Sequence, residues 1–182
     1  TGSLDFVQSS SLKFKGGTSE TSPRGFHFKP DGTKFFMVGN TKDTIYEYSL
    51  SKPWSLGDGT VSGSTAESSL DFVQSSSLQF KGGTSELNPE SIHFKPDGTK
   101  FFVVGAQKNK IYEYSLSTPW DISSSSGSVD VMTGSLDFVQ SSSLKFKGGT
   151  DESGPRDIHF KPDGTKMFIL GVETDSIFEY SL

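Results

Sequence analysis

The chain has 182 residues, a formal net charge of −5 and no cysteine, and only 31% of its residues are hydrophobic. The interspersed charges argue against nucleic acid as a partner, the missing cysteines exclude disulfides and thiolate metal sites, and no apolar run is long enough for membrane insertion. With 16 phenylalanines and 20 glycines, the composition favours short strands joined by polar turns over long amphipathic helices.

Short apolar stretches predict four strands in the first 50 residues, over 3–15, 26–28, 35–38 and 45–50. The first stretch is interrupted by serines, and the third is apolar at every position, which indicates burial on both faces. Between the second and third strands, Lys29-Pro30-Asp31-Gly32 has the residues of a hairpin turn with glycine at positive φ. This turn needs no ligand to explain it.

The same order of elements occurs three times. The words SLDFVQSSSL begin at Ser3, Ser69 and Ser135, which sets a period of 66 residues. Such a period is typical of stacked or ring-forming supersecondary units. We therefore expect one repeat domain with units at 3–68, 69–134 and 135–182, the third truncated before its Ser/Gly-rich connection.

Four antiparallel strands per unit predict an all-β fold of β-propeller blades, each covered on both faces by its neighbours. Three blades are too few to close a ring, so we expect a homodimer with six blades. Residues 3–15 of one chain would then pair with 176–182 of the other, because these strands are left without partners at the two ends. The alternative is a β-trefoil-like three-fold barrel, which would close as a monomer.

A resemblance supports the propeller. The words FKPDGTKFFVVG, IYEYSL and STPWDIS, which run from Phe94 to Ser123, resemble repeats of phage-encoded and bacterial β-propeller-like proteins. They are more distantly similar to WD40 and TolB-like propellers. The resemblance covers 23–56, 89–122 and 155–182. It implies a propeller and no particular activity, since members of this repeat group mostly lack an assigned one.

Two sets of repeated polar residues are candidates for a site. The three histidines could line a central channel and bind an anion or a metal, but their spacing around a channel favours structural hydrogen bonding, so we expect no metal and no cofactor. The mid-strand glutamates are expected to pair with lysines of the first strand of a unit. These residues are His27, His93 and His159, then Glu47, Glu113 and Glu179, with Lys13, Lys15, Lys81, Lys145 and Lys147 as the lysine partners.

Candidate ligand-binding residues come from two further features. Trp54 and Trp120 each follow a proline just after the last strand of a unit, where an indole could stack on a sugar or pack on a neighbouring blade. The segments that differ between units are 20–25, 86–91 and 152–157, then 40–44, 106–110 and 172–176, and we expect the two groups at opposite ends of the propeller. The second group supplies the candidates Asn40, Lys42, Gln107, Lys108 and Glu173.

The sequence contains no nucleophile elbow, phosphate loop or His-Glu-x-x-His motif. It therefore favours a non-enzymatic structural or recognition module of a virion or bacterial cell-surface assembly, extracellular or on a virion, with glycan or protein as a further partner. One alternative is a lectin-like, carbohydrate-binding propeller. The other is a hydrolase or lyase with its site in the central channel.

Overall fold

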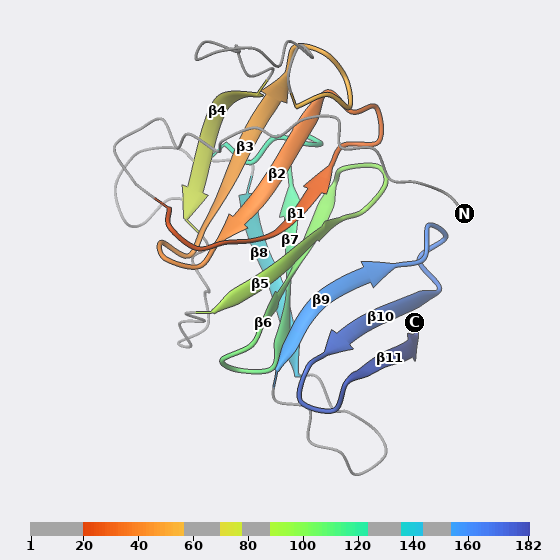
Figure 1. Cartoon of the computed structure of the whole chain (residues 1–182). Coiled ribbons are helices and arrows are strands. Elements are labelled where there is room, and N and C mark those ends of the chain that lie inside the picture. The colour runs from red at the N-terminus through yellow and green to blue at the C-terminus, as the bar shows by residue number, and fades with distance from the viewer. Residues whose placement is uncertain (1–19, 57–69, 78–87, 124–135, 144–153) are drawn as a thin grey trace, which may run out of the picture.

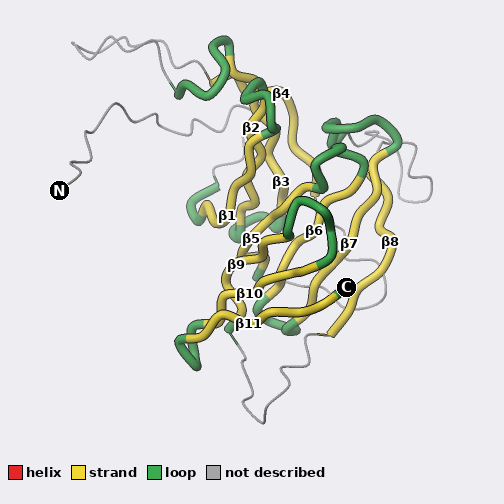
Figure 2. Tube along the Cα trace, turned by 90° about the vertical axis from the view of Figure 1, so that its right-hand side faces the viewer, coloured by secondary structure: helices red, strands yellow, loops and turns green. Residues whose placement is uncertain are grey.

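The computed structural model describes residues 20–56, 70–77, 88–123, 136–143 and 154–182, which form strands and loops only (Figures 1 and 2). The strands, in chain order, are β1 (Pro23–Phe28), β2 (Lys34–Gly39), β3 (Thr44–Leu50), β4 (Leu70–Ser77), β5 (Pro89–Phe94), β6 (Lys100–Gly105), β7 (Lys110–Leu116), β8 (Leu136–Ser143), β9 (Pro155–Phe160), β10 (Lys166–Gly171) and β11 (Ser176–Ser181). The prediction of an all-β chain is confirmed for this part of the sequence.

The strands form three separate antiparallel sheets with orders β1-β2-β3-β4, β5-β6-β7-β8 and β9-β10-β11. The fourth strand of a sheet comes from the next repeat, since β3 pairs with β4 from Leu50 opposite Leu70 to Thr44 opposite Ser77. Each sheet is thus offset from the 66-residue unit. The third sheet has three strands in the described residues, and the predicted strand over 3–15 lies outside them.

The Pro-Asp-Gly turn joins the first two strands of every sheet. The N–H of Gly32 donates to the carbonyl oxygen of Lys29 at 2.8 Å, and Gly32 has a φ of 72°. The Asp31 carboxylate accepts the backbone N–H of Thr33 at 3.0 Å. The predicted hairpin with glycine at positive φ is confirmed, and the second and third turns repeat it.

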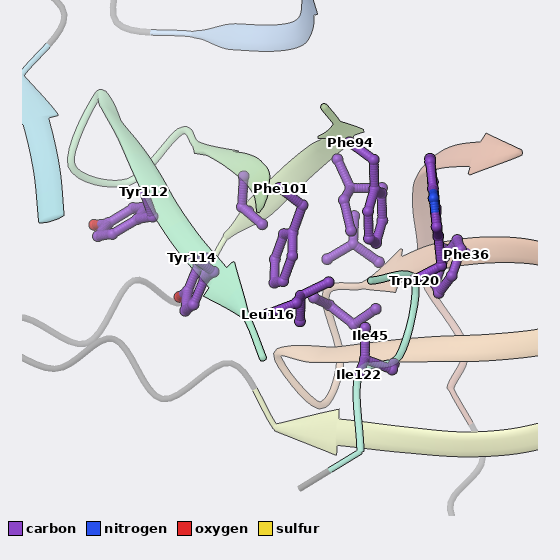
Figure 3. Close-up of a cluster of buried hydrophobic side chains, with 12 residues drawn as sticks. Phe36, Ile45, Phe94, Phe101, Tyr112, Tyr114, Leu116, Trp120 and Ile122 are labelled. Atoms are coloured by element: carbon purple, nitrogen blue, oxygen red, sulfur yellow. The ribbon is translucent and has the colours of Figure 1, made fainter. Parts of the chain in front are cut away.

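Alternation along the strands gives each sheet two apolar faces. The front face carries Phe36, Val38, Ile45 and their repeats, and the back face carries Phe35, Tyr46, Tyr48 and theirs. The front face of the first sheet packs on the back face of the second in one buried cluster, shown in Figure 3, and the front face of the second packs on the back face of the third. This stacking of sheet on sheet explains why the predicted third strand of each unit is apolar on both sides.

The tryptophan segment that follows β7 fills part of the first interface. Trp120 has a φ of 62°, and its backbone N–H donates to the carbonyl oxygen of Gly98 at 3.1 Å. The indole therefore lies over the turn. Its ring stacks on Phe94 with centroids 5.1 Å apart, and Ile122 is fully buried beside Ile45 (Figure 3). The segment therefore belongs to the second sheet but packs against the first.

The lysines predicted to pair with the glutamates lie outside the described residues, and the described lysine partner of Glu47 is a different one. Glu47 accepts a hydrogen bond from Lys34 at 2.6 Å, and Lys34 belongs to β2 rather than to the predicted outer strand. Glu47 lies opposite Phe36, so Lys34 is its diagonal neighbour on the same face, within reach of a long side chain. The outer strand β4 supplies Gln74 directly opposite Glu47, with a bond of 2.7 Å.

The two groups of variable loops lie at the same end of the sheets, against prediction. The N–H of Asn40, after β2, donates to the carbonyl oxygen of Ser22, before β1, at 3.0 Å. The buried Glu20 carboxylate accepts the backbone N–H groups of Thr41 and Lys42. The reason is the antiparallel pairing of β1 with β2, which places the start of one strand beside the end of the other.

Candidate active site on the inner strands

The strands β1, β5 and β9 form the inner edges of the three sheets and follow one another side by side (Figure 1). Each begins with proline and ends with His-Phe. The pairing of each inner strand with the next strand has a bulge just after the proline. A bulge re-aims the side chains beside it and is common next to active sites.

The histidines form a row across the three inner strands. The ring centroids of His27 and His93 are 4.8 Å apart, and those of His93 and His159 are again 4.8 Å apart, both edge to face. Burial, with a smaller effect of the charge on His159, lowers the pKa of His27 to about 4. Burial, followed by the charges of both neighbours, lowers the pKa of His93 to about 3. Both are therefore neutral imidazoles at neutral pH.

A charged row crosses the same strands near their first residues. Glu90 has a side chain only 3% exposed and lies between two arginines. Arg156 Nη1 forms an ion pair with Glu90 Oε1, and Arg24 Nη1 lies 3.7 Å from Glu90 Oε2. The arginine side chains are 37% and 40% exposed, so each guanidinium keeps N–H groups for an anionic or carbonyl oxygen of a ligand.

A third row lies between the arginines and the histidines. The Ser91 hydroxyl donates to Asp157 Oδ1, which also accepts the N–H of Ile158 at 2.9 Å. The equivalent position in β1 is Gly25, where a Cβ atom would lie 2.5 Å from the Cα of Ser91. Glycine thus lets the first two inner strands approach closely at this row.

The three rows combine neutral imidazoles, a carboxylate and guanidinium groups on one set of neighbouring strands. The arginine row precedes the histidine row by three positions along each strand, with the bulge at the arginine end. Among the described residues, no group of three or more histidine, aspartate or glutamate side chains is arranged to hold a metal ion.

The structure places Trp120 against the histidine row, with its ring stacked on His27 at a centroid distance of 6.1 Å. Trp120 is 7% exposed and packed between two sheets, whereas Trp54 is 60% exposed. The remaining candidates lie in the loops between the second and third strands of the sheets. Asn40 is half-buried, and the exposed ones are Lys42, Gln107, Lys108 and Glu173.

Sequence reasoning missed the arginine and serine–aspartate rows, although it selected the segments that contain them. Residues 20–25, 86–91 and 152–157 were recognised as variable, and their last two positions are Arg-Gly, Glu-Ser and Arg-Asp. The available signal was the change of charge from Arg24 to Glu90 to Arg156 at one position of the repeat. These residues form ion pairs only because three neighbouring strands bring them together.

Neither a family model nor a curated protein matches the sequence. Solved structures do match. Two are named "putative 6-phosphogluconolactonase", from Bacteroides uniformis (TM-score 0.50, 18% identity, 88% of this chain and 37% of that one) and from Bacteroides fragilis (0.54, 15%, 98% and 42%). A third is a protein from Lactobacillus plantarum (0.53, 18%, 87% and 37%). The chain spans about two fifths of the length of these proteins.

These likenesses show the fold, which is of the β-propeller type rather than a trefoil barrel. None of the described residues lies in a helix able to cross a membrane. The predicted extracellular or virion location stays a prediction.

The comparisons contradict the prediction of a non-enzymatic module of a virion or cell-surface assembly. Two of these neighbours are named as lactonases, which are enzymes and not structural modules. The prediction failed because it relied on the absence of linear catalytic motifs. A site formed by one residue from each of several repeats leaves no such motif in the sequence.

Proposed function

We propose that this chain belongs to a hydrolase of lactones or related esters of sugar acids, with its site on the inner strands. The observation that carries the proposal is the row of three histidine rings beside the Arg24–Glu90–Arg156 row. The names of the structural neighbours support the substrate class, and the arginines suit a substrate with an anionic end.

In the proposed reaction, water attacks the carbonyl carbon of the lactone and an imidazole accepts the proton of that water. His159 is our candidate for this base, because it is the exposed member of the row. The ring C–O bond of the lactone then breaks, and the alkoxide that leaves takes the proton back from the imidazolium. Arg24 and Arg156 would hold the anionic end of the substrate.

The test is the hydrolysis of sugar-acid δ-lactones at pH 7, followed in a pH-stat with and without a phosphate group on the substrate. His159→Gln should lower kcat by at least about a hundredfold, the usual effect of losing a general base. Arg156→Ala should raise KM for the phosphorylated lactone and leave KM for the neutral one unchanged.

The matched control is Gln107→Ala, an exposed loop residue outside the three rows, which should hydrolyse lactones like the parent chain. A parent protein that hydrolyses no lactone above the uncatalysed rate would overturn the proposal. So would a His159→Gln variant with full activity.

The finer architecture also belongs to this proposal. We expect the three sheets to be half of a six-bladed ring made by two copies, with 3–15 of one copy pairing with 176–182 of the other. The free edge of β11, which has no partner strand in the described residues, supports this arrangement. In such a ring the histidine row would continue into the second copy, so that each copy contributes to one axial site.

A further inference from the structure

The tryptophan segment that follows β7 shows how two neighbouring sheets bind an indole between them. The ring of Trp120 stacks on Phe94 of β5, with centroids 5.1 Å apart (Figure 3). Its centroid also lies 6.1 Å from the rings of Phe36 on β2 and His27 on β1. Lys34 Nζ donates to the carbonyl oxygen of Trp120 at 2.8 Å. Three aromatic rings and one lysine therefore hold this segment.

The same side chains occur between the second and third sheets, in the same arrangement. The rings of Phe102 and Phe160 are 4.4 Å apart with an interplanar angle of 32°, and the equivalent pair in the first interface is 4.3 Å apart with an angle of 35°. His93 lies 5.5 Å from Phe160, against 5.6 Å for the equivalent pair. Lys100 pairs with Glu113 as the equivalent lysine pairs with its glutamate. The second set is thus formed in advance of any indole.

Among the described residues, no tryptophan lies over the turn of the third sheet. A Cβ atom added to Gly98 would lie 2.1 Å from Trp120, whereas one added to Gly164 would meet nothing within 4 Å. Gly98 is buried and Gly164 is exposed. Phe94 is 1% exposed, but its repeat Phe160 is only partly buried. The aromatic rings of the second set are therefore accessible at the position that an indole fills in the first.

Both tryptophans of this chain are held at other positions. Trp120 is 7% exposed and packed in the first interface. The backbone N–H of Trp54 donates to the carbonyl oxygen of Gly32 at 3.0 Å, and its ring lies 5.3 Å from Phe28 of the same sheet. Because a second copy would have to break these contacts to supply Trp54, the occupant that fits is a different polypeptide.

The sequence of that polypeptide follows from the bonds inside the bound segment. The N–H of Asp121 donates to the carbonyl oxygen of Thr118 at 3.2 Å, and Asp121 Oδ1 accepts the N–H of Ser123 at 2.8 Å. Ile122, between them, is fully buried. A short peptide with these residues can form the same turn by itself, which reduces the conformational entropy that it loses on binding.

The residues that would surround the indole are called the indole surface, and they are His93, Lys100, Phe102, Phe160 and Gly164. We propose that the indole surface binds a segment of a partner protein with the sequence type Thr-Pro-Trp-Asp-Ile-Ser. The backbone N–H of the ligand tryptophan donates to the carbonyl oxygen of Gly164, and Lys100 Nζ donates to the carbonyl oxygen of that tryptophan. The indole packs on the three aromatic rings.

The test is a fluorescence anisotropy titration of the full chain with a labelled peptide, Ser-Thr-Pro-Trp-Asp-Ile-Ser, the sequence of 117–123. We expect saturable binding of one peptide per chain. The peptide with alanine in place of tryptophan should bind at least about tenfold more weakly, because a buried tryptophan is a typical hot spot. Lys100→Ala should weaken binding of the parent peptide by about tenfold, as expected for a lost hydrogen bond from a charged group.

The matched control is Lys166→Ala, which should bind the peptide like the parent chain. Lys166 is the equivalent lysine of the third sheet, lies outside the indole surface, and pairs with its own glutamate as Lys100 does. The two lysine side chains are 42% and 41% exposed, so they differ in position and not in exposure to water. Equal loss of binding in both variants would overturn the proposal.

Nuclear magnetic resonance locates the bound peptide. The imidazole C–H signals of His93 should move upfield on binding, because the indole would lie against this ring as Trp120 lies against His27. The signals of His27 should stay unchanged. Unchanged His93 signals, or no saturable binding up to about 1 mM peptide, would overturn the proposal.

Sedimentation of the parent chain separates a partner protein from a second copy as the occupant. The peptide should leave the mass of the particle unchanged apart from its own. A dimer that the peptide dissociates would assign the indole surface to a second copy and overturn the proposal of a partner. None of these measurements contains a lactone, so their outcome is independent of the proposed hydrolysis.

Discussion

Trp120 and Trp54 occupy the same position in successive repeats, and the difference between them is informative. Both have a φ near 60°. In both, the backbone N–H donates to the carbonyl oxygen of the glycine in the preceding turn, at 3.1 Å for Trp120 and 3.0 Å for Trp54. Yet Trp120 is 7% exposed and Trp54 is 60% exposed. The local conformation is therefore set within the repeat, and burial is set by whether another sheet lies in front.

The glutamates of the third strands also differ in their exposure to water. The side chain of Glu47 is 1% exposed, that of Glu113 is 13% exposed and that of Glu179 is 52% exposed, although each pairs with the lysine of its own second strand. One ion pair is thus present in three environments within one molecule. Its contribution to stability should follow its exposure to water.

The largest loss of stability is expected for a substitution of Trp120. Trp120→Ala removes a buried indole between two sheets and should lower the free energy of unfolding by about 3–5 kcal/mol at every protein concentration. Trp54→Ala removes an indole that is 60% exposed and should lower the free energy of unfolding by less than about 1 kcal/mol. Urea unfolding over a range of protein concentrations measures both. Equal losses for the two variants in dilute solution would contradict the comparison.

The second-largest loss of stability is expected for Glu47→Ala. It removes the carboxylate that holds Lys34, Gln74 and the N–H of Ile122, and we expect a loss of about 3 kcal/mol, as for other broken buried ion pairs. Glu179→Ala removes a carboxylate that is 52% exposed and should cost less than about 1 kcal/mol. Urea denaturation gives the two values, and similar losses would show that burial does not decide the contribution.

The turn glycines offer a smaller, matched comparison. In Gly98→Ala the new Cβ atom would lie 2.1 Å from Nε1 of Trp120 and clash with the indole. In Gly164→Ala the new Cβ atom would have no other atom within 4 Å. Both have positive φ, which costs about 1–2 kcal/mol for a residue with a Cβ atom. Gly98→Ala should exceed Gly164→Ala by about 1–2 kcal/mol in thermal unfolding, because the overpacked indole must move. The reverse order would be evidence against this packing.

The smallest effect concerns pH. Burial lowers the pKa values of His27 and His93 in the folded chain to about 4 and about 3, from the usual histidine value of about 6.5. The unfolded chain therefore binds more protons below pH 6.5, so stability should fall as the pH drops from 6.5 towards 4. Allowing for partial exposure, we expect on the order of 1 kcal/mol per histidine. His93→Gln should flatten this dependence of Tm on pH, and an unchanged slope would contradict it.

Much of the fold could be predicted because the same pattern of strands and turns occurs three times in the sequence. The Pro-Asp-Gly turn, the strand apolar on both faces and the 66-residue period predicted the hairpins and the stacked sheets. The partner of Glu47 could not be predicted, because a lysine two residues along a neighbouring strand and one on the outer strand satisfy the same pattern. Only the register, with Glu47 opposite Phe36, selects Lys34.

The candidate site was predictable only in part. The sequence indicates the histidines and the variable segments, but it predicts a structural role for the histidines and opposite ends of the propeller for the two groups of variable segments. Chain proximity cannot show that Arg24, Glu90 and Arg156, each separated by 66 residues from the next, form one row. That row exists because the inner strands of successive sheets lie side by side.

The sequence by itself determined what is local in this protein. Proline and glycine fixed the turns through φ, and alternation fixed which side chains share a face, since both depend on a few neighbouring residues. The tertiary structure decided what depends on neighbours distant in the chain. Equivalent residues of successive repeats are buried or exposed according to which sheet lies in front of them, because desolvation is a property of the surroundings and not of the residue.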